Sequence, residues 1–370
     1  MTAVTTHRSV PAPLAKLEGL PVYKPGKSAE ATMAEHGLTY AAKLSSNENP
    51  FGPLPSVVDA ITEAASDINR YPDTSASALR QALAAFLRVP VERVTSGAGS
   101  TGVLLQALNA FSGPGAEVAF NWRSFEAYPI FSRSVGATDV TAPLKAHRLD
   151  LTALAEVVGP HTKVVLIANP NNPTGTVATE DELRTFLSVV RSDVLVVLDE
   201  AYTEFIDDGA TVNGVTLIDE FPNLLISRTM SKAYGLAGLR VGYAVGQPTV
   251  IAALDKVAAP FATTSVSQAA AVASFQAAAQ AELAERVAVI RAERGRVIRE
   301  ARSLGFEVPD SQANLIWLPI GERTVDVFTA LERNGVVSRA FPGDGVRITI
   351  GSPRENDMVL EALRTVSPSY

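Results

Sequence analysis

Three separated groups of polar residues could do chemistry together, because each one follows a short apolar run. Lys232 lies in the turn after the sequence LLIS, residues 169–175 (NPNNPTG) follow 163–168 (KVVLIA), and residues 199–202 (DEAY) follow 194–198 (VLVVL). Nearly continuous apolar runs are typical of parallel strands that are buried on both faces. Ligands bind at the carboxyl ends of such strands in open α/β sheets. We therefore expect the three groups to meet at one edge of a sheet.

Each group taken alone has a plain structural interpretation. A lysine in a loop is usually solvated, and Asp199 could cap a helix. A carboxylate at the end of an apolar strand is costly to bury unless it has a partner. No structural requirement would produce an amine, a carboxylate and an amide at the ends of three strands, so the combination favours a shared ligand.

With these motifs the chain resembles the fold-type I aminotransferases that depend on pyridoxal 5′-phosphate (PLP). It is most similar to the branch that holds histidinol-phosphate and aromatic amino-acid aminotransferases, and within it to the actinobacterial aromatic enzymes, in the sequences WRSFEAYP, SQAN and SKAYGLAGLRVGYA. The resemblance covers nearly the whole chain. It implies an α/β fold with a large domain, whose mostly parallel sheet lies between helices, and a smaller α/β domain. We expect an N-terminal arm and part of the small domain at 1–50, the large PLP-binding domain at 51–260, and a linking helix with the small C-terminal domain at 261–370.

The resemblance also assigns roles around the PLP ring. Lys232 is expected to bond to PLP and then to act as the base that moves the substrate's α-proton. Asp199 is expected to hold the ring nitrogen protonated, which makes the ring an electron sink. Tyr202 and Asn172 are expected to share its phenolic oxygen. Phe125 is expected to stack on the ring, without the hydroxyl that many relatives carry there.

The phosphate group of PLP is expected where the sequence GAGSTG precedes a helical pattern. A helix amino terminus offers free N–H groups and the positive end of a dipole to any phosphate. Gly99 and Ser100 belong to this turn. Thr229, Ser231 and Arg240 have the spacing to approach from the lysine side, with Arg240 as a charge-assisted fork.

The substrate side of the site is expected to hold Arg347, Asn49 and Asn172, with Arg339 and Asn314 as further candidates. The resemblance makes Arg347 the receptor of the substrate's α-carboxylate, which a guanidinium can bind with two hydrogen bonds. An edge-strand arginine facing solvent is the alternative interpretation of Arg347.

Tyr71 lies in an exposed turn, 69–73 (NRYPD), and on sequence alone is a surface aromatic. The resemblance implies that it reaches the PLP phosphate of a second subunit. A homodimer with a composite active site is therefore expected.

The expected reaction transfers an amino group between an aromatic L-amino acid (phenylalanine, tyrosine or tryptophan) and 2-oxoglutarate in ping-pong order. Histidinol phosphate is the alternative substrate, because Arg347 could bind its phosphate. GAGSTG also matches the G-x-G-x-x-G fingerprint of NAD enzymes, with Glu117 near the place of the ribose-binding acid. A non-catalytic regulator, a β-lyase or a decarboxylase with the same fold remain further alternatives.

Bulk properties are those of an ordinary globular enzyme. The 370 residues include 46% hydrophobic and 19% charged residues, and the formal charge of −7 argues against nucleic acid or an anionic membrane as the main partner. The absence of cysteine excludes disulfides and thiolate sites, and the four histidines have no metal-ligand spacing. No apolar run is long enough for a membrane span and no signal-peptide core is evident, so a cytoplasmic location is expected.

Several local predictions bear on the architecture. The proline-containing residues 1–45 are expected to have little regular structure, and residues 91–96 to form a strand. Residues 275–304 predict one long helix that links the two domains. Residues 314–318 and 346–350 alternate in polarity, which predicts strands of a sheet with one covered face.

Overall fold

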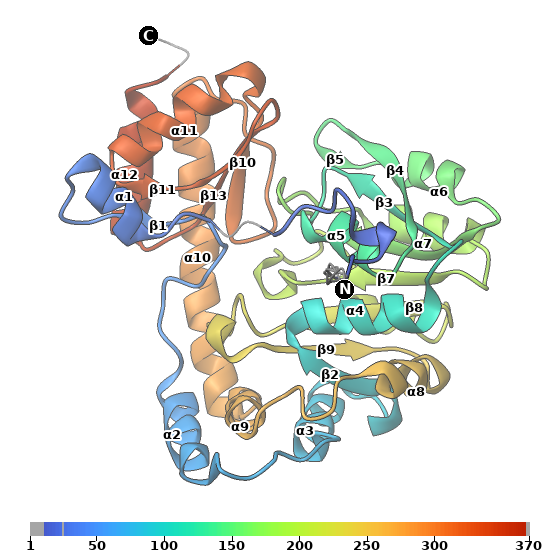
Figure 1. Ribbon diagram of the computed structural model, residues 1–370. Helices are drawn as coiled ribbons and strands as arrows, with labels where there is room; N and C mark the ends of the chain where they lie inside the picture. The colour runs from blue at the N-terminus through green and yellow to red at the C-terminus, as the bar shows by residue number, and fades with distance from the viewer. Residues whose placement is uncertain (1–10, 24–25, 368–370) are drawn as a thin grey trace, which may run out of the picture.

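A computed structural model describes residues 11–23 and 26–367, and its largest element is an eight-stranded sheet (Figure 1). In their order across the sheet, the strands are β2 (Val94–Ala98), β9 (Val241–Val245), β8 (Leu224–Thr229), β7 (Leu195–Asp199), β6 (Thr162–Ala168), β3 (Glu117–Trp122), β4 (Thr138–Lys145) and β5 (Arg148–Leu149). Strands β4, β3, β6, β7 and β8 are parallel, whereas β9 is antiparallel to both of its neighbours.

The direction of β9 decides where the functional loops lie. Because β9 is antiparallel to β8 and to β2, strand β2 points the same way as β8. The carboxyl ends of β2, β3, β6, β7 and β8 therefore meet at one edge of the sheet. All three polar groups, and the GAGSTG turn after β2, begin at this edge.

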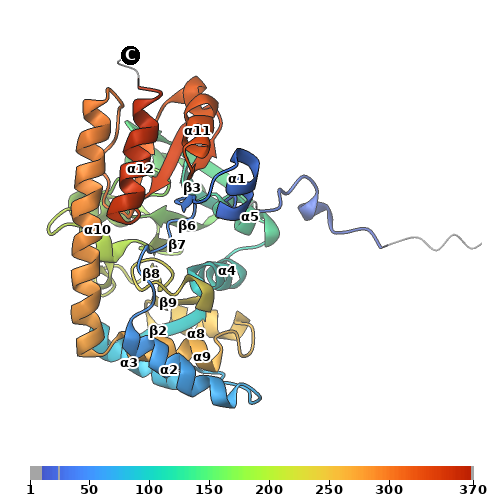
Figure 2. The ribbon, with the colours of Figure 1, turned by 90° about the vertical axis from the view of Figure 1, so that its left-hand side faces the viewer.

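Helices cover both faces of the sheet, which explains why its central strands are apolar throughout. One face packs against α4 (Gly99–Phe111), α5 (Ala127–Ser134) and α8 (Pro248–Val257), and the other against α3 (Ser77–Leu87), α6 (Leu151–Val157) and α7 (Glu180–Val189). Leu104 and Phe120 belong to the first core, while Phe186 and Ile167 belong to the second. Alternate residues of one strand thus enter different cores. Helices α2 (Pro55–Ala64) and α9 (Ser265–Ser274) pack on each other, and α9 also contacts α3. The three helices lie together at the bottom of Figure 2.

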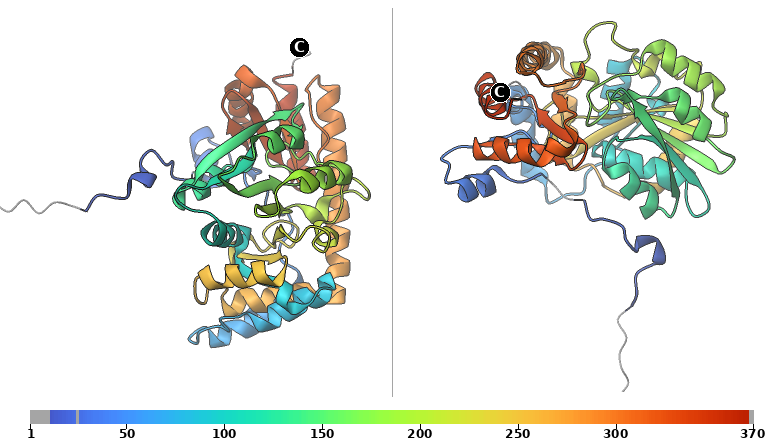
Figure 3. Two further views of the ribbon diagram at one scale, coloured as in Figure 1. Left: turned by 90° about the vertical axis from the view of Figure 1, so that its right-hand side faces the viewer. Right: turned by 90° about the horizontal axis from the view of Figure 1, so that it is seen from above.

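A smaller group of elements lies beside the large sheet, as Figure 1 and the view from above in Figure 3 show. It contains a three-stranded antiparallel sheet in the order β10 (Leu315–Leu318), β13 (Gly345–Thr349) and β12 (Arg339–Phe341), and a parallel pair of β1 (Ala42–Lys43) and β11 (Val336–Val337). Its helices are α1 (Ala29–His36), α11 (Thr324–Arg333) and α12 (Pro353–Arg364). The short 3-10 turns among the described residues are η1 (Ala15–Leu17), η2 (Ala65–Asp67), η3 (Val91–Arg93), η4 (Thr203–Phe205), η5 (Gly214–Leu217), η6 (Ala237–Leu239) and η7 (Gly321–Arg323).

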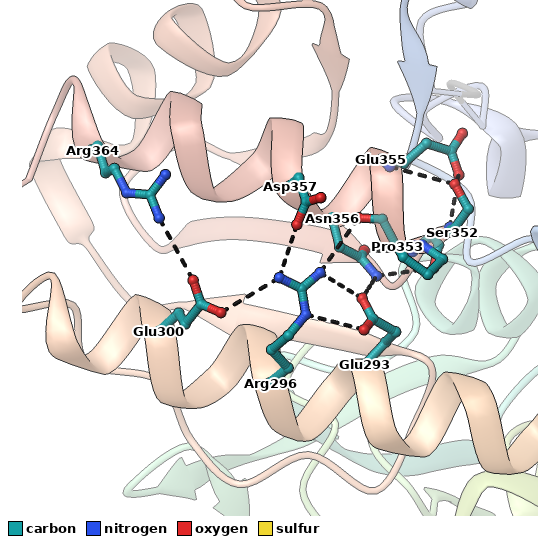
Figure 4. A network of polar contacts seen from close by, with 10 residues as sticks. Glu293, Arg296, Glu300, Ser352, Pro353, Glu355, Asn356, Asp357 and Arg364 are labelled. Atoms are coloured by element: carbon teal, nitrogen blue, oxygen red, sulfur yellow. Dashed lines mark hydrogen bonds and ion pairs between the residues drawn. The ribbon is translucent and has the colours of Figure 1, made fainter.

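The long helix α10 (Ala277–Ser303) runs past both groups of elements, as the pattern at 275–304 predicts (Figure 2). A network of charged side chains ties its carboxyl-terminal half to α12 (Figure 4). Arg296 lies at the centre, where it donates to Glu293 at 2.7 Å and to Asp357 at 2.9 Å, and Arg364 pairs with Glu300 at 3.6 Å. Charges that share partners in this way stabilise more than isolated exposed pairs. This half of α10 is therefore anchored to the smaller group of elements.

Three local predictions are wrong in part. Within 1–45, residues 29–36 form α1, whose N-cap Ser28 accepts a hydrogen bond from the backbone of Ala31, so this segment has more regular structure than expected. The residues before Val94 form the turn η3 and not the start of a strand. Strands β10 and β13 are buried along their whole length, because helices cover one face and the large sheet's loops and residues 44–47 cover the other.

Among the described residues, no helix has the length and apolar character that crossing a membrane requires.

Candidate active site

A cavity of about 250 Å³ lies at the carboxyl edge of the large sheet, where the smaller group of elements meets it. Most of the residues expected in the site line this cavity. They are Ser100, Phe125, Asn172, Asp199, Tyr202, Thr229, Ser231, Lys232, Arg240, Arg339 and Arg347. Residues that are far apart in the sequence, from β2 to β13, therefore converge on one space.

Asp199 ends β7 and is only 5% exposed. Its Oδ2 accepts a hydrogen bond from the hydroxyl of Tyr128, on α5, at 3.0 Å, whereas its Oδ1 is buried and has no partner among the described residues. Burial raises the pKa of Asp199 to about 7, and the nearby charge of Glu200 adds to this effect. A buried carboxylate with one open acceptor suits a ligand that carries an N–H group, such as a protonated pyridine nitrogen.

Lys232 follows β8 closely in the chain, and it lines the cavity. Nζ donates to the carbonyl oxygen of Ser46 at 2.9 Å. Burial, together with the positive charges of Arg347 and Arg240, lowers the pKa of Lys232 to about 7. An amine with this pKa is largely neutral at pH 8, so it can act as a nucleophile or as a base.

Tyr202 and Asn172 both line the cavity, and each has a buried polar partner. The hydroxyl of Tyr202 accepts from Nδ2 of Asn47 at 2.8 Å, and Thr349 in turn donates to Oδ1 of Asn47 at 3.1 Å. Oδ1 of Asn172 accepts from Nη1 of Arg347 at 2.7 Å. These contacts connect the loops of the large sheet to β13.

Arg347 is buried, and the acceptors that it contacts are uncharged. It donates to Asn172 and to the carbonyl oxygen of Ser45, and its Nε has no partner among the described residues. Burial lowers the pKa of Arg347, although a guanidinium remains charged at neutral pH. β13 is the central strand of its sheet, so the alternative of a solvent-facing edge arginine is excluded. A buried cation without a carboxylate partner suits an anionic substrate group.

A second part of the cavity has the donors of an anion site. Ser100 and Thr101 lie in the first turn of α4, which no side chain caps. Nη1 of Arg240 donates to Ser231 at 3.2 Å, and Thr229 donates to the same hydroxyl at 3.0 Å. Hydroxyls, a helix amino terminus and a guanidinium together are a typical phosphate site.

Two glycines allow the close approach that this arrangement needs. Gly99 has φ +75°, and a Cβ there would lie 2.5 Å from Nη2 of Arg240. A Cβ on Gly242 would lie 2.2 Å from the backbone of Gly99. The GAGSTG turn therefore needs its second glycine so that Arg240 can lie against α4. Strand β2 is at the edge of the sheet beside an antiparallel strand, which does not support the NAD-binding alternative.

Four expected site residues are not among those that line the cavity: Gly99, described above, and Tyr71, Asn49 and Asn314. Tyr71 is 82% exposed and stacks on Phe261, with ring centroids 4.5 Å apart. Asn49 donates to the carbonyl oxygen of Ala233 at 2.6 Å, so it fixes the loop next to Lys232. Asn314 is fully buried and donates to the backbone of residues 47 and 48.

Sequence reasoning missed three residues that shape the site. Asn47 looks like an ordinary loop residue, although its side chain orients Tyr202. Tyr128 looks like a core aromatic in the sequence, and its ring does pack in the core, 5.6 Å from that of Phe125. Glu126 pairs with Arg339 through two contacts of 3.2 Å. The signal for Glu126 is a single carboxylate close to two aromatic residues in the sequence SFEAYP.

Comparisons with known proteins agree with this geometry. The family model of class I and II aminotransferases matches residues 41–363. The aromatic amino acid aminotransferase of Thermobifida fusca is 49% identical over 97% of this chain and 98% of its own length, and that of Streptomyces avermitilis is 49% identical over 94% and 95%. The crystal structure of histidinol-phosphate aminotransferase from Sinorhizobium meliloti, in complex with PLP, superposes with a TM-score of 0.87 at 31% identity, over 98% of this chain and 99% of that one. The chain belongs to the class I and II aminotransferases and has their fold-type I architecture.

Proposed function

We propose that this protein is a PLP-dependent aminotransferase that exchanges amino groups between an aromatic L-amino acid and 2-oxoglutarate. The names of the relatives at 49% identity over nearly the whole chain support the aromatic substrate. The observation that carries the proposal is the convergence of Lys232, Asp199 and Arg347 on one cavity. These are the amine, carboxylate and guanidinium that transamination of an amino acid needs.

The residues present fit PLP. The open Oδ1 of Asp199 would accept from the pyridine nitrogen, and Tyr202 and Asn172 would bind the phenolic oxygen. Phe125 lines the same space and would stack on the ring. The phosphate would lie against Ser100, Thr229, Ser231 and Arg240. Gly99 lets Arg240 lie close to the start of α4.

When bound, PLP supplies an aldehyde that takes up the amino group and a ring that withdraws electrons from the α-carbon. Nζ of Lys232 accepts the α-proton and returns it, which its lowered pKa permits at neutral pH. Asp199 holds the proton on the ring nitrogen. Tyr128 keeps the Asp199 carboxylate oriented through Oδ2, which would leave Oδ1 to the ring nitrogen.

Arg347 binds the α-carboxylate of the amino acid and of the oxo acid in turn. Because Arg347 contacts only uncharged acceptors in the described structure, no carboxylate of the chain competes with the substrate. Phe125, Tyr23 and the apolar parts of the cavity would contact the aromatic side chain. Apolar contacts discriminate between rings only modestly, so phenylalanine, tyrosine and tryptophan are all expected as substrates.

The exposed stack of Tyr71 on Phe261 supports a homodimer in which Tyr71 reaches the PLP phosphate of the second subunit. We further propose a cytoplasmic enzyme. Its arm and part of the small domain would span 1–50, the PLP-binding domain 51–260, and the linking helix with the small domain 261–370.

Histidinol phosphate is the second candidate substrate, because a second arginine, Arg339, lines the cavity beside Arg347. The test is to measure kcat/KM of the PLP-loaded protein with phenylalanine and with histidinol phosphate, each with 2-oxoglutarate. We expect at least about a tenfold preference for phenylalanine. A strong preference for histidinol phosphate would replace the aromatic assignment, and failure with both donors would contradict the transaminase assignment.

A further inference from the structure

Two arginines of the same small sheet line the cavity, and they have different partners. Arg339 on β12 and Arg347 on β13 are direct cross-strand neighbours, so their side chains are on the same face of the sheet. Arg347 contacts only the neutral oxygens of Asn172 and Ser45. Arg339 instead makes an ion pair with Glu126, in which both Nε and Nη2 donate to the carboxylate at 3.2 Å.

Glu126 is well placed to hold Arg339. It directly follows Phe125, which lines the cavity, and it is the N-cap residue of α5. Both side chains of the pair are largely covered, with exposed fractions of 27% for Glu126 and 18% for Arg339. The pair joins a loop of the large sheet to the small sheet, and it occupies two donors of Arg339 that would otherwise be available to a ligand.

The pair changes the net charge of the cavity wall that a substrate would contact. With both arginines free, this wall would carry two adjacent cations, which suits a phosphate or a second carboxylate. With Arg339 neutralised by Glu126, one unpaired cation remains, which matches a substrate with one carboxylate and an uncharged side chain.

We propose that Glu126 is a specificity-determining residue that favours amino-group donors with an uncharged side chain over donors that carry a phosphate, by keeping Arg339 paired at the edge of the cavity. This inference rests on the proposed aminotransferase function and identifies the substrate class within it. Glu126 acts through Arg339, so it is a positioning residue and not a catalytic one.

The experiment compares substrate preference in the PLP-loaded Glu126→Gln variant. The readout is the ratio of kcat/KM for histidinol phosphate to kcat/KM for phenylalanine, with 2-oxoglutarate as the common acceptor. Glutamine keeps the size of the side chain but removes its charge. We expect the ratio to rise at least about tenfold in Glu126→Gln, because Arg339 becomes available to the phosphate. The KM for 2-oxoglutarate, whose second carboxylate is also anionic, is expected to fall.

Matched variants separate this role from a structural one. Glu126→Asp keeps the charge and should keep a ratio near that of the wild type. The double variant Glu126→Gln/Arg339→Gln should lose the gain, because the cation that produces it is gone. Glu220→Gln removes a carboxylate from an exposed pair with Arg184 and controls for net charge alone.

Each outcome has a distinct meaning. An unchanged ratio in Glu126→Gln, or an equal loss of kcat/KM with both donors, would overturn the inference and indicate that the pair only fastens the two sheets together. A gain that persists without Arg339 would also overturn it. If the wild type itself prefers histidinol phosphate, the aromatic assignment fails separately, and the ratio in the variants still reports on Glu126.

Discussion

Tyr128 donates a hydrogen bond to one oxygen of Asp199 at 3.0 Å and leaves the other oxygen buried without a partner among the described residues. The pair joins α5 to the end of β7, which are separated by 71 positions in the sequence. An uncompensated buried carboxylate oxygen is destabilising, so it is expected where a ligand completes the contact. The Tyr128–Asp199 hydrogen bond therefore determines which oxygen of Asp199 is left open to a ligand.

This relationship predicts different effects for the two residues. Asp199→Ala should lower kcat/KM by on the order of 1000-fold, because a group that stabilises charge on the ring is removed. Tyr128→Phe keeps the aromatic core contact and should cost about tenfold or less, because Asp199 stays but is less well oriented. Steady-state kinetics with phenylalanine and 2-oxoglutarate would check both. Equal losses in the two variants would contradict the assignment of separate roles.

The pKa of Lys232 predicts how fast the PLP-free protein takes up its cofactor at different pH values. Only the neutral amine attacks an aldehyde, and the pKa of Lys232 is lowered to about 7. The second-order rate of PLP uptake should therefore rise between about pH 6 and pH 7 and level off near pH 8. Stopped-flow absorbance would measure it, with N-acetyl-lysine as the reference amine. A rate that still rises tenfold per pH unit above pH 9 would show an ordinary lysine.

The raised pKa of Asp199 predicts a dependence of stability on pH in the PLP-free protein. The folded pKa is about 7 and the ordinary value is 3.8, so the folded state binds more protons between these values. The stability that the protonated group provides is fully present below pH 3.8 and is lost as the pH rises through 7. Asp199→Asn mimics the protonated form, so it should raise the free energy of unfolding at pH 8 by up to a few kcal/mol, at about 1.4 kcal/mol per pKa unit.

Urea unfolding of the two PLP-free proteins would measure this difference. The gain of Asp199→Asn over wild type should grow from pH 4 to pH 7 and then stay constant. A gain that is the same at pH 4.5 and pH 8 would mean that the titration of Asp199 is not its cause.

The uncharged partners of Arg347 predict that lysine cannot replace it. The guanidinium binds Asn172 and Ser45 and still has an unpartnered Nε, and an ammonium cannot provide this planar set of donors. Arg347→Lys should raise KM for phenylalanine by on the order of 100-fold, while PLP binding changes little. Kinetics together with PLP titration would check it. A large loss of PLP affinity with unchanged KM would indicate that Arg347 serves the cofactor.

The sequence was sufficient to predict which loops share an edge of the sheet. Polar residues after nearly continuous apolar runs predicted the ends of β6, β7 and β8, and Asp199 and Lys232 do line one cavity. The prediction worked because apolar runs report burial on both faces directly. A different rule, alternation of polarity, failed for residues 314–318 and 346–350. It indicated one covered face, but Asn314 and Arg347 are polar and buried with partners.

Contacts between distant side chains could not be predicted from one sequence. In the sequence, Tyr128 looks like an ordinary core aromatic. Only the fold, which brings its hydroxyl to Asp199 at the end of β7, shows that it also orients this carboxylate. Asn47 and Glu126 were missed for the same reason, because their partners Tyr202 and Arg339 are 155 and 213 positions away. Helix α1 was missed because the prolines around it dominate the local composition.

A composite active site makes a further prediction about mixtures of inactive variants. If Tyr71 acts in the site of the second subunit, Lys232→Ala and Tyr71→Ala each inactivate a homodimer by a different defect. A heterodimer of the two has one site with an intact Lys232 from one chain and an intact Tyr71 from the other.

Unfolding and refolding the two variants together, with PLP, should therefore restore activity to about one quarter of the wild-type value per site, by random pairing of subunits. Each variant refolded alone should remain at its own low level. Borohydride reduction followed by mass spectrometry gives a second readout, because PLP should become attached only to chains that retain Lys232. Full activity of Tyr71→Ala alone, or no recovery in the mixture although size-exclusion chromatography shows dimers, would mean that Tyr71 does not complete the neighbouring site. Its exposed stack on Phe261 would then need another partner.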